Sequence, residues 1–437
     1  MTTSSRRTRA AVGATGALAL VLGLTACSTS SGDAGSEDVT LRVAWWGSQE
    51  RHDNFLSLID EYEAENPGVT IEAEYSDSGG HWDRLATTTA GGDAPDVIAF
   101  DKEHLFQYGG RGALADLNTL DTIDTSDFPE ASIDQGSLDG ELFGLPFSQN
   151  AYTVVANEDL FSQAGVELPD DSTWTWDDFY EVSNAVATKL GGDVRGSDYG
   201  EAGNATLEMW LGQHGESLFA ADGSAEIGYD VDTAAAWFEH LEHIRDAASG
   251  PSPDEFIEEM SGVFEEGRFL TNRSALAFYY ASQLPALETA SGSTMALLRP
   301  PSQDGSAEEN GLAHIPSWFW GISSRTEHPE AAADLVDFLS NDPRVAKTML
   351  VSLGVPASTA NQEVILPELD ATGQEVVEFI SETGPEVTFV PPSSPPGSGS
   401  VGDSVIRYME EVLFDRLEPA DAAAQLTAEI EDQLARG

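Results

Sequence analysis

The sequence predicts an α/β protein that begins with a parallel, doubly wound sheet. Three strand-like segments, residues 39–45, 69–75 and 94–100, are separated by two segments with helical spacing. Strands that alternate with helices pair in parallel, because each helix carries the chain back across a face of the sheet. The chain has 437 residues, which is long for a single core, so we expect two domains.

The helices between these strands are identified by their apolar spacing and by their ends. Apolar side chains recur at i, i+3, i+4 and i+7 from Phe55 to Tyr62, and the ENPG stretch that follows ends this helix. A second helix, residues 82–90, is closed by two glycines. Further helices are expected within residues 104–117, 168–190, 230–248, 254–266, 314–340 and 403–434, and further strands within 152–156, 274–284, 294–305 and 314–340.

Three local signals refine this outline. The Gly-Leu-Pro stretch at residues 144–146 is expected to break the first unit, so that the apolar run 152–156 starts the second. Thr175 or Asp177 is expected to cap the helix that follows. Residues 391–400, rich in proline, glycine and serine, are expected to form a loop.

The strongly negative charge excludes several classes of partner. The chain holds 76 acidic and 20 basic residues, a formal net charge of −56. A surface of this sign repels nucleic acid and anionic membranes. We interpret most of these acids as a solvated face that favours solubility.

The first 26 residues differ from the rest and predict a signal peptide. Three arginines precede an uncharged run that is rich in alanine, glycine and leucine and too short for a comfortable membrane span. The run ends in Leu-Thr-Ala-Cys, which resembles a bacterial lipobox, so Cys27 is expected to carry lipid after cleavage. The alternative is a leftover thiol in an ordinary secretory signal. Because Cys27 is the only cysteine, the chain can form neither an internal disulfide nor a thiolate metal cluster.

Large aromatic and polar residues lie at the ends of the first three strands. Trp45 and Trp46 end the first, Tyr75 the second, and Asp101 follows the third. Open α/β sheets bind ligands outside the carboxyl ends of their strands. Neighbouring strand residues point to opposite faces. We therefore expect one tryptophan to cover the sheet and the other to lie over a ligand crevice.

The order of short motifs along the chain resembles one known family. Each motif is weak alone, but together, from Cys27 to the end, they are specific. The motifs are the lipobox, ENPGV, GGDAPDVIAFD, RGALADL, FGLPF, STWTWDDF, FEEGR ahead of SALAFYYAS, WGISSRTEHPEAAADLVDFL and LGVPAS. In this order the chain resembles the extracellular solute-binding proteins of bacterial ABC importers, in the family (family 1) that serves sugars and oligosaccharides. Its acidity is heavier than this resemblance leads us to expect.

The resemblance implies a two-lobe, periplasmic-binding-protein-like (Venus flytrap) α/β fold, with a hinge and a central ligand cleft. It implies a monomeric binding protein rather than an enzyme, without cofactor, which carries a carbohydrate to the permease subunits of an ABC transporter at the outer face of the cell membrane. The expected segments are residues 1–26 as signal peptide, 27–37 as lipidated cysteine and tether, 38–147 with 297–352 as one lobe, and 148–296 with 353–437 as the other.

Sugars present apolar faces that stack on aromatic rings and hydroxyl groups that pair with polar side chains. In the first lobe the candidates are Trp45, Trp46, Gln49, Asp101 and Glu103. Asp101 matches an acidic position that the family uses for sugar hydroxyls. The alternatives are a core and lid role for the tryptophans, a surface position for Gln49 and a helix cap for Asp101, with Glu103 as its rival.

Further candidates lie at the crossing and in the second lobe. Gln149 and Asn150 face either the cleft or the hinge, and Asn204 precedes a helix in which Trp210 is either a ligand contact or a core residue. Another set of candidates combines the aromatic residues that end two later strands. They are Tyr279 and Tyr280, with Ser282 or Gln283 beside them, and Trp318 and Trp320, which share one strand face that lines either the cleft or the core.

Three alternative functions remain open on the sequence. No catalytic set or phosphate loop stands out, but a secreted glycoside hydrolase with paired carboxylates is one alternative. A binding protein for a polyamine, peptide or metal is the second, and the acidity suits a polyamine. A surface protein without a transport role is the third. His240 and His243 share a helix face, which is more typical of a solvated surface than of a metal site.

Overall fold

The structure is a computed structural model that describes residues 38–199, 204–221, 224–247, 249–261, 266–392, 394–395 and 397–436. The expected signal peptide, the lipidation site Cys27 and the tether lie outside the described residues. Within the part of the chain that is described, no helix is both long enough and apolar enough to span a bilayer.

The strands belong mainly to one mixed sheet. Its strands are β1 (Val39–Trp46), β2 (Val69–Ser76), β3 (Val97–Phe100), β6 (Leu145–Asn157), β9 (Leu276–Tyr280), β10 (Met295–Leu298), β11 (His314–Ile322) and β12 (Val355–Pro356). Short two-stranded ribbons are formed by β4 (Ser137–Leu138) with β5 (Glu141–Leu142) and by β7 (Ser217–Phe219) with β8 (Ile227–Gly228).

The helices follow the strands along the chain. They are α1 (Gln49–Glu65), α2 (Ser78–Gly91), α3 (Lys102–Gly109), α4 (Glu130–Asp134), α5 (Glu158–Ala164), α6 (Trp176–Leu190), α7 (Ala205–Gly212), α8 (Val231–Asp246), α9 (Pro253–Ser261), α10 (Leu284–Ser291), α11 (Pro329–Asn341), α12 (Pro343–Met349), α13 (Thr359–Ile365), α14 (Ala371–Thr383), α15 (Val401–Leu413) and α16 (Pro419–Leu434).

The first part of the sheet is parallel, as predicted. Strand β1 pairs in parallel with β2 on one side and with β3 on the other, and α1 and α2 connect them. The carboxyl ends of these strands therefore meet at one edge of the sheet. Beyond β3 the sheet continues with antiparallel strands, so it is mixed rather than parallel throughout.

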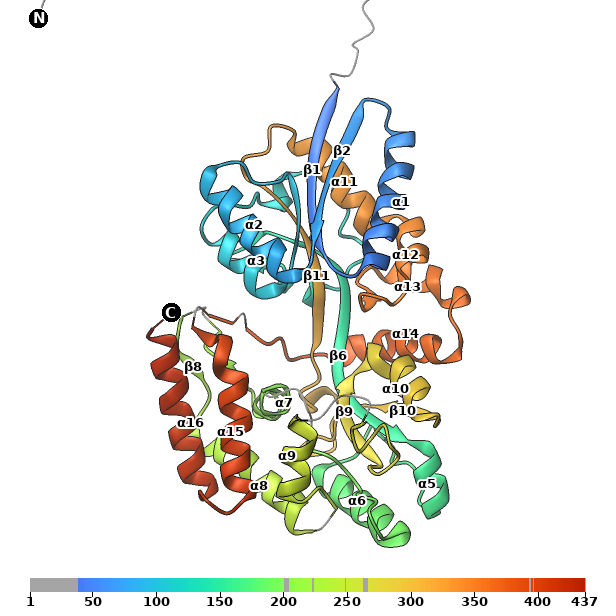
Figure 1. The fold of residues 1–437 in the computed structure, drawn as a ribbon, viewed down its shortest axis with the longest axis vertical. Coiled ribbons are helices and arrows are strands. Elements are labelled where there is room, and N and C mark those ends of the chain that lie inside the picture. The colour runs from blue at the N-terminus through green and yellow to red at the C-terminus, as the bar shows by residue number, and fades with distance from the viewer. Residues whose placement is uncertain are drawn as a thin grey trace, which may run out of the picture. The chain divides into compact units, whose positions relative to one another are not determined.

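Strand β6 shows that the expected break at Gly-Leu-Pro is wrong. β6 runs without interruption from Leu145 to Asn157 and includes Pro146. Its first half pairs with β11 and its second half with β9 and β10 (Figure 1). Proline removes a hydrogen bond from a ladder and is tolerated at irregular pairings. The register of β11 against β6 shifts twice close to this proline.

Buried apolar residues form several clusters along this long strand. Two clusters gather around β1, β3 and the end of β11 that pairs with β3, and include Trp45, Phe100 and Trp320. Two others gather around β9, β10 and the C-terminal helices, and include Phe278 and Val405. Strands β6 and β11 connect these two regions, and Figure 1 shows both strands running between them.

Helix ends follow the local sequence closely. Thr175 caps α6 in a capping box with Asp178, which decides between the two expected caps. Gly92 closes α2 in the left-handed conformation, with φ of 76°. The helix expected over 403–434 is two helices, α15 and α16, because Asp415 takes a positive φ of 53° between them.

Candidate functional site

The two adjacent tryptophans at the end of β1 occupy different environments. Trp45 is fully buried, packs edge-on against Phe55, and donates a hydrogen bond from Nε1 to His52 Nδ1 at 3.1 Å. Trp46 points to the other face of the sheet and stays partly exposed. Strand alternation separates the two rings as the sequence predicts: Trp45 is core, and Trp46 lies at the edge where the parallel strands end.

Trp46 is the centre of an aromatic ladder, which consists of Trp318, Trp46, Trp82 and His104. The ring of Trp46 stacks on Trp318 at 4.2 Å and an interplanar angle of 22°, and it contacts Trp82 at 4.9 Å. Trp82 in turn stacks on His104 at 3.7 Å and 4°. The four rings come from β11, β1, α2 and α3, so the fold assembles them from distant parts of the chain.

Polar side chains surround one end of this ladder. Asp101 caps α3, accepts a hydrogen bond from the His104 backbone N–H at 2.8 Å, and lies 2.8 Å from His104 Nδ1. Asp101 is therefore a helix cap and also borders the ladder, so its position is compatible with both the capping role and the ligand-binding role that the sequence left open. Glu103 is exposed in the first turn of α3. Gln49 is exposed at the start of α1, where it donates to Asp53.

Lys102 is a site residue that the sequence analysis missed. Its ammonium group donates to Gln135 Oε1 at 3.3 Å and to the carbonyl oxygen of Pro391 at 2.5 Å. Burial lowers the pKa of Lys102 to about 8, and the negative charge of Glu208 opposes this shift. Lys102 thus joins the start of α3 to the segment that precedes α15.

Glu208, on α7, faces the same region from the other side. Burial raises the pKa of the Glu208 carboxyl to about 7, and the positive charge of Lys102 opposes this shift. Burial and the nearby Glu208 also raise the pKa of Tyr280, at the end of β9. Phe389 packs so closely on Gly212 of α7 that a Cβ there would lie 2.7 Å from its ring. The 389–391 segment therefore contacts both α7 and Lys102.

Asn150 fixes the middle of the crossing strand to the end of β9. Its Nδ2 donates to Ser282 Oγ at 2.7 Å, and its Oδ1 accepts from the Ser282 backbone N–H at 3.1 Å. Gln149 is buried beside it and accepts from Ser132 Oγ at 3.0 Å. Gln149 borders a pocket of about 270 Å³ that also includes Gln135 and His314.

Several sequence candidates are core residues in this structure. Trp210 is buried and donates from Nε1 to the Thr233 carbonyl oxygen at 3.2 Å. Tyr279 is buried against Phe269, with ring centres 5.5 Å apart. Trp320 is fully buried. Together with Trp45, these side chains contribute packing rather than an accessible surface.

The remaining candidates lie nearer to the site. Trp318 is buried but forms one end of the ladder, beneath Trp46. Tyr280 is partly exposed and contacts Tyr152 edge-on at 5.2 Å. Asn204 precedes α7 and makes no capping hydrogen bond with its side chain, so its amide is not committed to the helix end.

The missed residues carried weak sequence signals. Trp82 lies four residues into α2, the helix that begins directly after β2, and His104 lies in the first turn of α3. Both positions follow strand ends, so the same rule that selected Trp46 and Asp101 applies to them. Lys102 also follows a strand end, but its contacts, like the position of Glu208, depend on the approach of α7 and the 389–391 segment to α3, which only the tertiary fold supplies.

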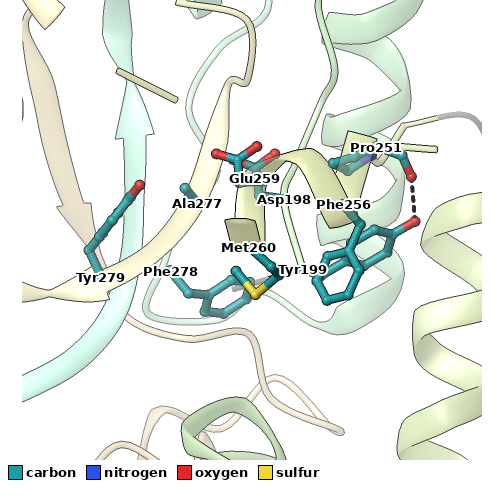
Figure 2. Close-up of a pocket in the computed structure, with 9 residues that line it drawn as sticks. All are labelled: Asp198, Tyr199, Pro251, Phe256, Glu259, Met260, Ala277, Phe278 and Tyr279. Carbon is teal, nitrogen blue, oxygen red and sulfur yellow. Dashed lines mark hydrogen bonds between the residues drawn. The ribbon is translucent and has the colours of Figure 1, made fainter. Parts of the chain in front are cut away.

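A second cavity, drawn in Figure 2, lies between β9 and α9. Phe256, Met260 and Phe278 line it, with the carboxylates of Asp198 and Glu259 at one side. Its volume is about 20 Å³, little more than one water molecule needs. This cavity is too small for a sugar ring.

Metal coordination has no support in the part of the chain that the structure describes, where no group of three histidine, cysteine, aspartate or glutamate side chains is placed to hold an ion. His240 is buried, and its Nδ1 lies 2.5 Å from the Tyr180 hydroxyl. His243 stacks on Tyr180 at 4.0 Å. This histidine pair therefore packs around a tyrosine.

Comparison with known proteins decides the family. A family profile described as bacterial extracellular solute-binding protein matches residues 57–373, which is more than half of the chain. The chain belongs to this family. Members of the family bind solutes, so this solute-binding protein is not an enzyme.

Individual relatives agree with this assignment. The solute-binding protein is 26% identical to an uncharacterized lipoprotein of Streptomyces antibioticus over 69% of this chain, and spans 66% of that relative, just under two thirds of its length. It is 23% identical to a maltodextrin-binding protein of Bacillus subtilis over 78% of this chain and 79% of that relative.

A solved structure confirms the fold. The periplasmic oligogalacturonide-binding protein from Yersinia enterocolitica superposes with a TM-score of 0.78 and 21% identity, over 91% of this chain and 99% of that chain. The predicted fold class, a two-lobe α/β fold of the periplasmic-binding-protein type, is therefore confirmed, and the hinge and the central ligand cleft stay predictions.

Proposed function

We propose that this solute-binding protein captures a sugar, in particular an oligosaccharide, between its two lobes and delivers it to an ABC permease. The aromatic ladder carries the proposal: the partly exposed rings of Trp46, Trp82 and His104, close to the carboxyl ends of parallel strands, offer apolar surface for the faces of sugar rings. Asp101 borders the ladder, Lys102 follows it on α3, and Glu208 on α7 is near enough to Lys102 to influence its pKa, so all three are candidates to pair with hydroxyl groups.

The two lobes of the proposal have the boundaries expected from the sequence, residues 38–147 with 297–352 and residues 148–296 with 353–437. The separate apolar clusters at the two ends of β6 support this division. Closure about β6 and β11 would bring the ladder and α7 together on a ligand, and ligand contacts to both lobes would favour the closed state.

The cellular setting is part of the same proposal. Signal-peptide cleavage before Cys27 and lipidation of that residue would hold a monomeric protein at the outer face of the membrane, where a permease would receive the sugar. A lipoprotein among the relatives supports this setting. Palmitate labelling that requires Cys27 in the producing bacterium would test it, and a Cys27→Ala variant released into the medium is the expected result.

The binding proposal is tested by titration of the domain from residue 28 onward with mono- and oligosaccharides. Tryptophan fluorescence and melting temperature are followed together. A saturable fluorescence change with a raised melting temperature for one class of sugar supports the proposal, because a ligand that binds only the native state stabilises it. A response to a polyamine or peptide, with none to any sugar, would contradict it.

A further inference from the structure

Two opposite charges approach the proposed sugar site from its two sides. Lys102 lies at the start of α3, between Asp101 and the turn that carries His104, whose ring stacks on Trp82. Glu208 lies on α7, near Tyr280. The 389–391 segment links the two sides, since Pro391 accepts from Lys102 and Phe389 packs on α7.

Neither charge is neutralised by a direct ion pair. Within the described ranges, no lysine or arginine nitrogen lies within 4.0 Å of Glu208, and no carboxylate oxygen lies that close to Lys102. The partners of Lys102 are an amide and a carbonyl oxygen. The two groups therefore influence each other through space while each retains capacity to bind a hydroxyl group between them.

Arg51 is a second cation near the ladder, and Asp101 is the carboxylate that borders it. The guanidinium group of Arg51 lies 5.2 Å from the ring centre of Trp318 and donates to the Trp46 carbonyl oxygen at 3.4 Å. Asp101, bound to His104, stands at the other end of the ladder. In a chain of net charge −56, this site thus brings two cations, Arg51 and Lys102, against two carboxylates, Asp101 and Glu208.

A charged ligand meets an unfavourable partner whichever sign it carries. A carboxylate placed near Lys102 also comes near Glu208, whose pKa is already raised to about 7 by burial. An ammonium group placed near Glu208 also comes near Lys102, whose pKa is already lowered to about 8. Attraction to one group is thus offset by repulsion from the other, while the charge of the ligand loses hydration in a partly desolvated site, a cost that an uncharged hydroxyl group avoids.

We propose that the site selects uncharged sugars and that Lys102 and Glu208 together set this selectivity, Glu208 against acidic sugars and Lys102 against amino sugars. This inference rests on the proposed function. It separates this protein from its structural neighbour, whose ligand is an oligogalacturonide. The strongly negative surface acts in the same direction against polyanionic sugars.

The test compares matched sugars on the domain from residue 28 onward. Maltotriose, cellotriose, arabinotriose and galactotriose are titrated by calorimetry beside trigalacturonate and the chitosan trimer, the charged counterparts of galactotriose and cellotriose. The readout is the ratio of dissociation constants of charged and neutral sugars. Glu208→Gln is expected to improve the relative affinity for the uronide about tenfold, and Lys102→Met that for the amino sugar by about as much.

Matched controls carry the same charge changes on α6. Glu181→Gln and Lys189→Met alter exposed side chains of that helix and should leave both ratios unchanged. The wild-type ratios test the proposal even where a variant fails to fold. Wild-type binding of a charged sugar as tight as that of its neutral counterpart would overturn the inference, and so would folded variants whose ratios stay unchanged. Absence of binding to every sugar would overturn the proposed function itself.

Discussion

At the scale of single residues, two neighbouring tryptophans have different environments, and we propose different roles for them: Trp45 packs in the core, and Trp46 binds the ligand. Trp45 and Trp46 share a strand, a chemistry and nearly the same position. Trp45 is enclosed by Phe55, Tyr75 and His52, whereas Trp46 lies between Trp318 and Trp82 at the edge where the proposed ligand would bind. The alternation of the strand alone decides which ring can meet a ligand.

Trp46→Ala is expected to weaken sugar binding by roughly 1–3 kcal/mol, because it removes the middle of the stacking platform. Calorimetric titration of the purified domain measures this effect. Its melting temperature should fall as well, because Trp46 packs on the buried ring of Trp318, so affinity is compared at a temperature where both proteins are folded. An unchanged affinity would remove Trp46 from the site.

Trp45→Phe should give a different pattern. It deletes the hydrogen bond to buried His52 and leaves that nitrogen without its partner, which should lower the free energy of unfolding by about 1–3 kcal/mol. Denaturant unfolding measures the loss, and calorimetry should show sugar affinity near that of the wild type. A variant that keeps its stability but loses its ligand would contradict the separation of roles.

The residues of the site differ in how far the sequence could predict them. The positions of Trp46 and Asp101 at the edge of the sheet could be predicted, because Trp46 ends one recognisable parallel strand and Asp101 directly follows another, whereas their role in binding stays a prediction. The contacts of Lys102 and the position of Glu208 could not be predicted, since they depend on the approach of α7 and the 389–391 segment to α3, and no local pattern encodes that approach. The core positions of Trp210 and Trp320 could not be separated from ligand positions, because alternation defines a face but not what covers it.

At the scale of elements, the end of α2 shows why two adjacent glycines are not equivalent. Gly91 is the last residue of the helix and has free space where a Cβ would stand. Gly92 takes the left-handed conformation, and a Cβ there would lie 2.6 Å from Arg325 Nη1. The first glycine weakens the helix, whereas the second is required to end it.

Alanine substitutions should therefore act in opposite directions. Gly92→Ala is expected to lower the free energy of unfolding by roughly 1–2 kcal/mol, the cost of a left-handed alanine. Gly91→Ala, its matched control, should raise it by about 0.5–1 kcal/mol. Urea unfolding of both variants measures the difference, and equal effects would show that the backbone conformation of Gly92 does not govern this helix end.

Titration of His314, at the start of β11, is expected to make the free energy of unfolding depend on pH. It is buried, its Nε2 lies 2.9 Å from Thr383 Oγ1, and burial lowers its pKa to about 4, against the opposing influence of Glu386. The unfolded chain binds this proton near pH 6.5 and the folded chain only near pH 4. The stabilisation by neutral His314 is therefore present above pH 6.5 and is lost as the pH falls towards 4.

The matched variant His314→Gln removes the titration and keeps a hydrogen-bonding side chain. The wild type should lose stability relative to this variant as the pH is lowered from 7 to 4.5, measured by denaturant unfolding at each pH. Parallel stability curves for the two proteins would show that His314 does not titrate differently in the folded and unfolded chains. The comparison between the two proteins cancels the titration of the many carboxylates.

Strand β6 shows that glycine and proline in the sequence are an incomplete guide to where a strand begins and ends. The parallel strands, the first two helices and the cap of α6 follow local signals and were predicted. Gly-Leu-Pro looked like a boundary because glycine and proline usually interrupt strands. Pairing with β11 on one half and β9 on the other overrides that local preference, and only the tertiary fold supplies those partners.

At the scale of the whole molecule, charge repulsion is the dominant long-range effect. The acids exceed the bases by 56, so the folded chain carries an unfavourable field that unfolding relieves. Salt screens this repulsion over roughly 10 Å at 0.1 M ionic strength. The net charge repulsion could be predicted from the composition alone, because it depends on the sum of the charges and not on their arrangement.

Raising sodium chloride from low concentration to 0.5 M should therefore raise the melting temperature by several degrees, measured by differential scanning calorimetry at pH 7. The same change of salt should affect ligand affinity much less if the ligand is an uncharged sugar. A melting temperature that falls or stays constant with salt would show that local ion pairs outweigh the net repulsion.

The central claim is that a sugar closes the two lobes on the aromatic ladder, and an interlobe distance tests it most directly. With Cys27 replaced no cysteine remains in the chain, so spin labels can be attached at cysteines introduced for the exposed Thr87 on α2 and Ala424 on α16. Pulsed electron resonance on this protein should show a shorter distance when a neutral oligosaccharide saturates it, and no change for Trp46→Ala at the same concentration. A distance distribution that stays the same at saturating sugar would contradict the account.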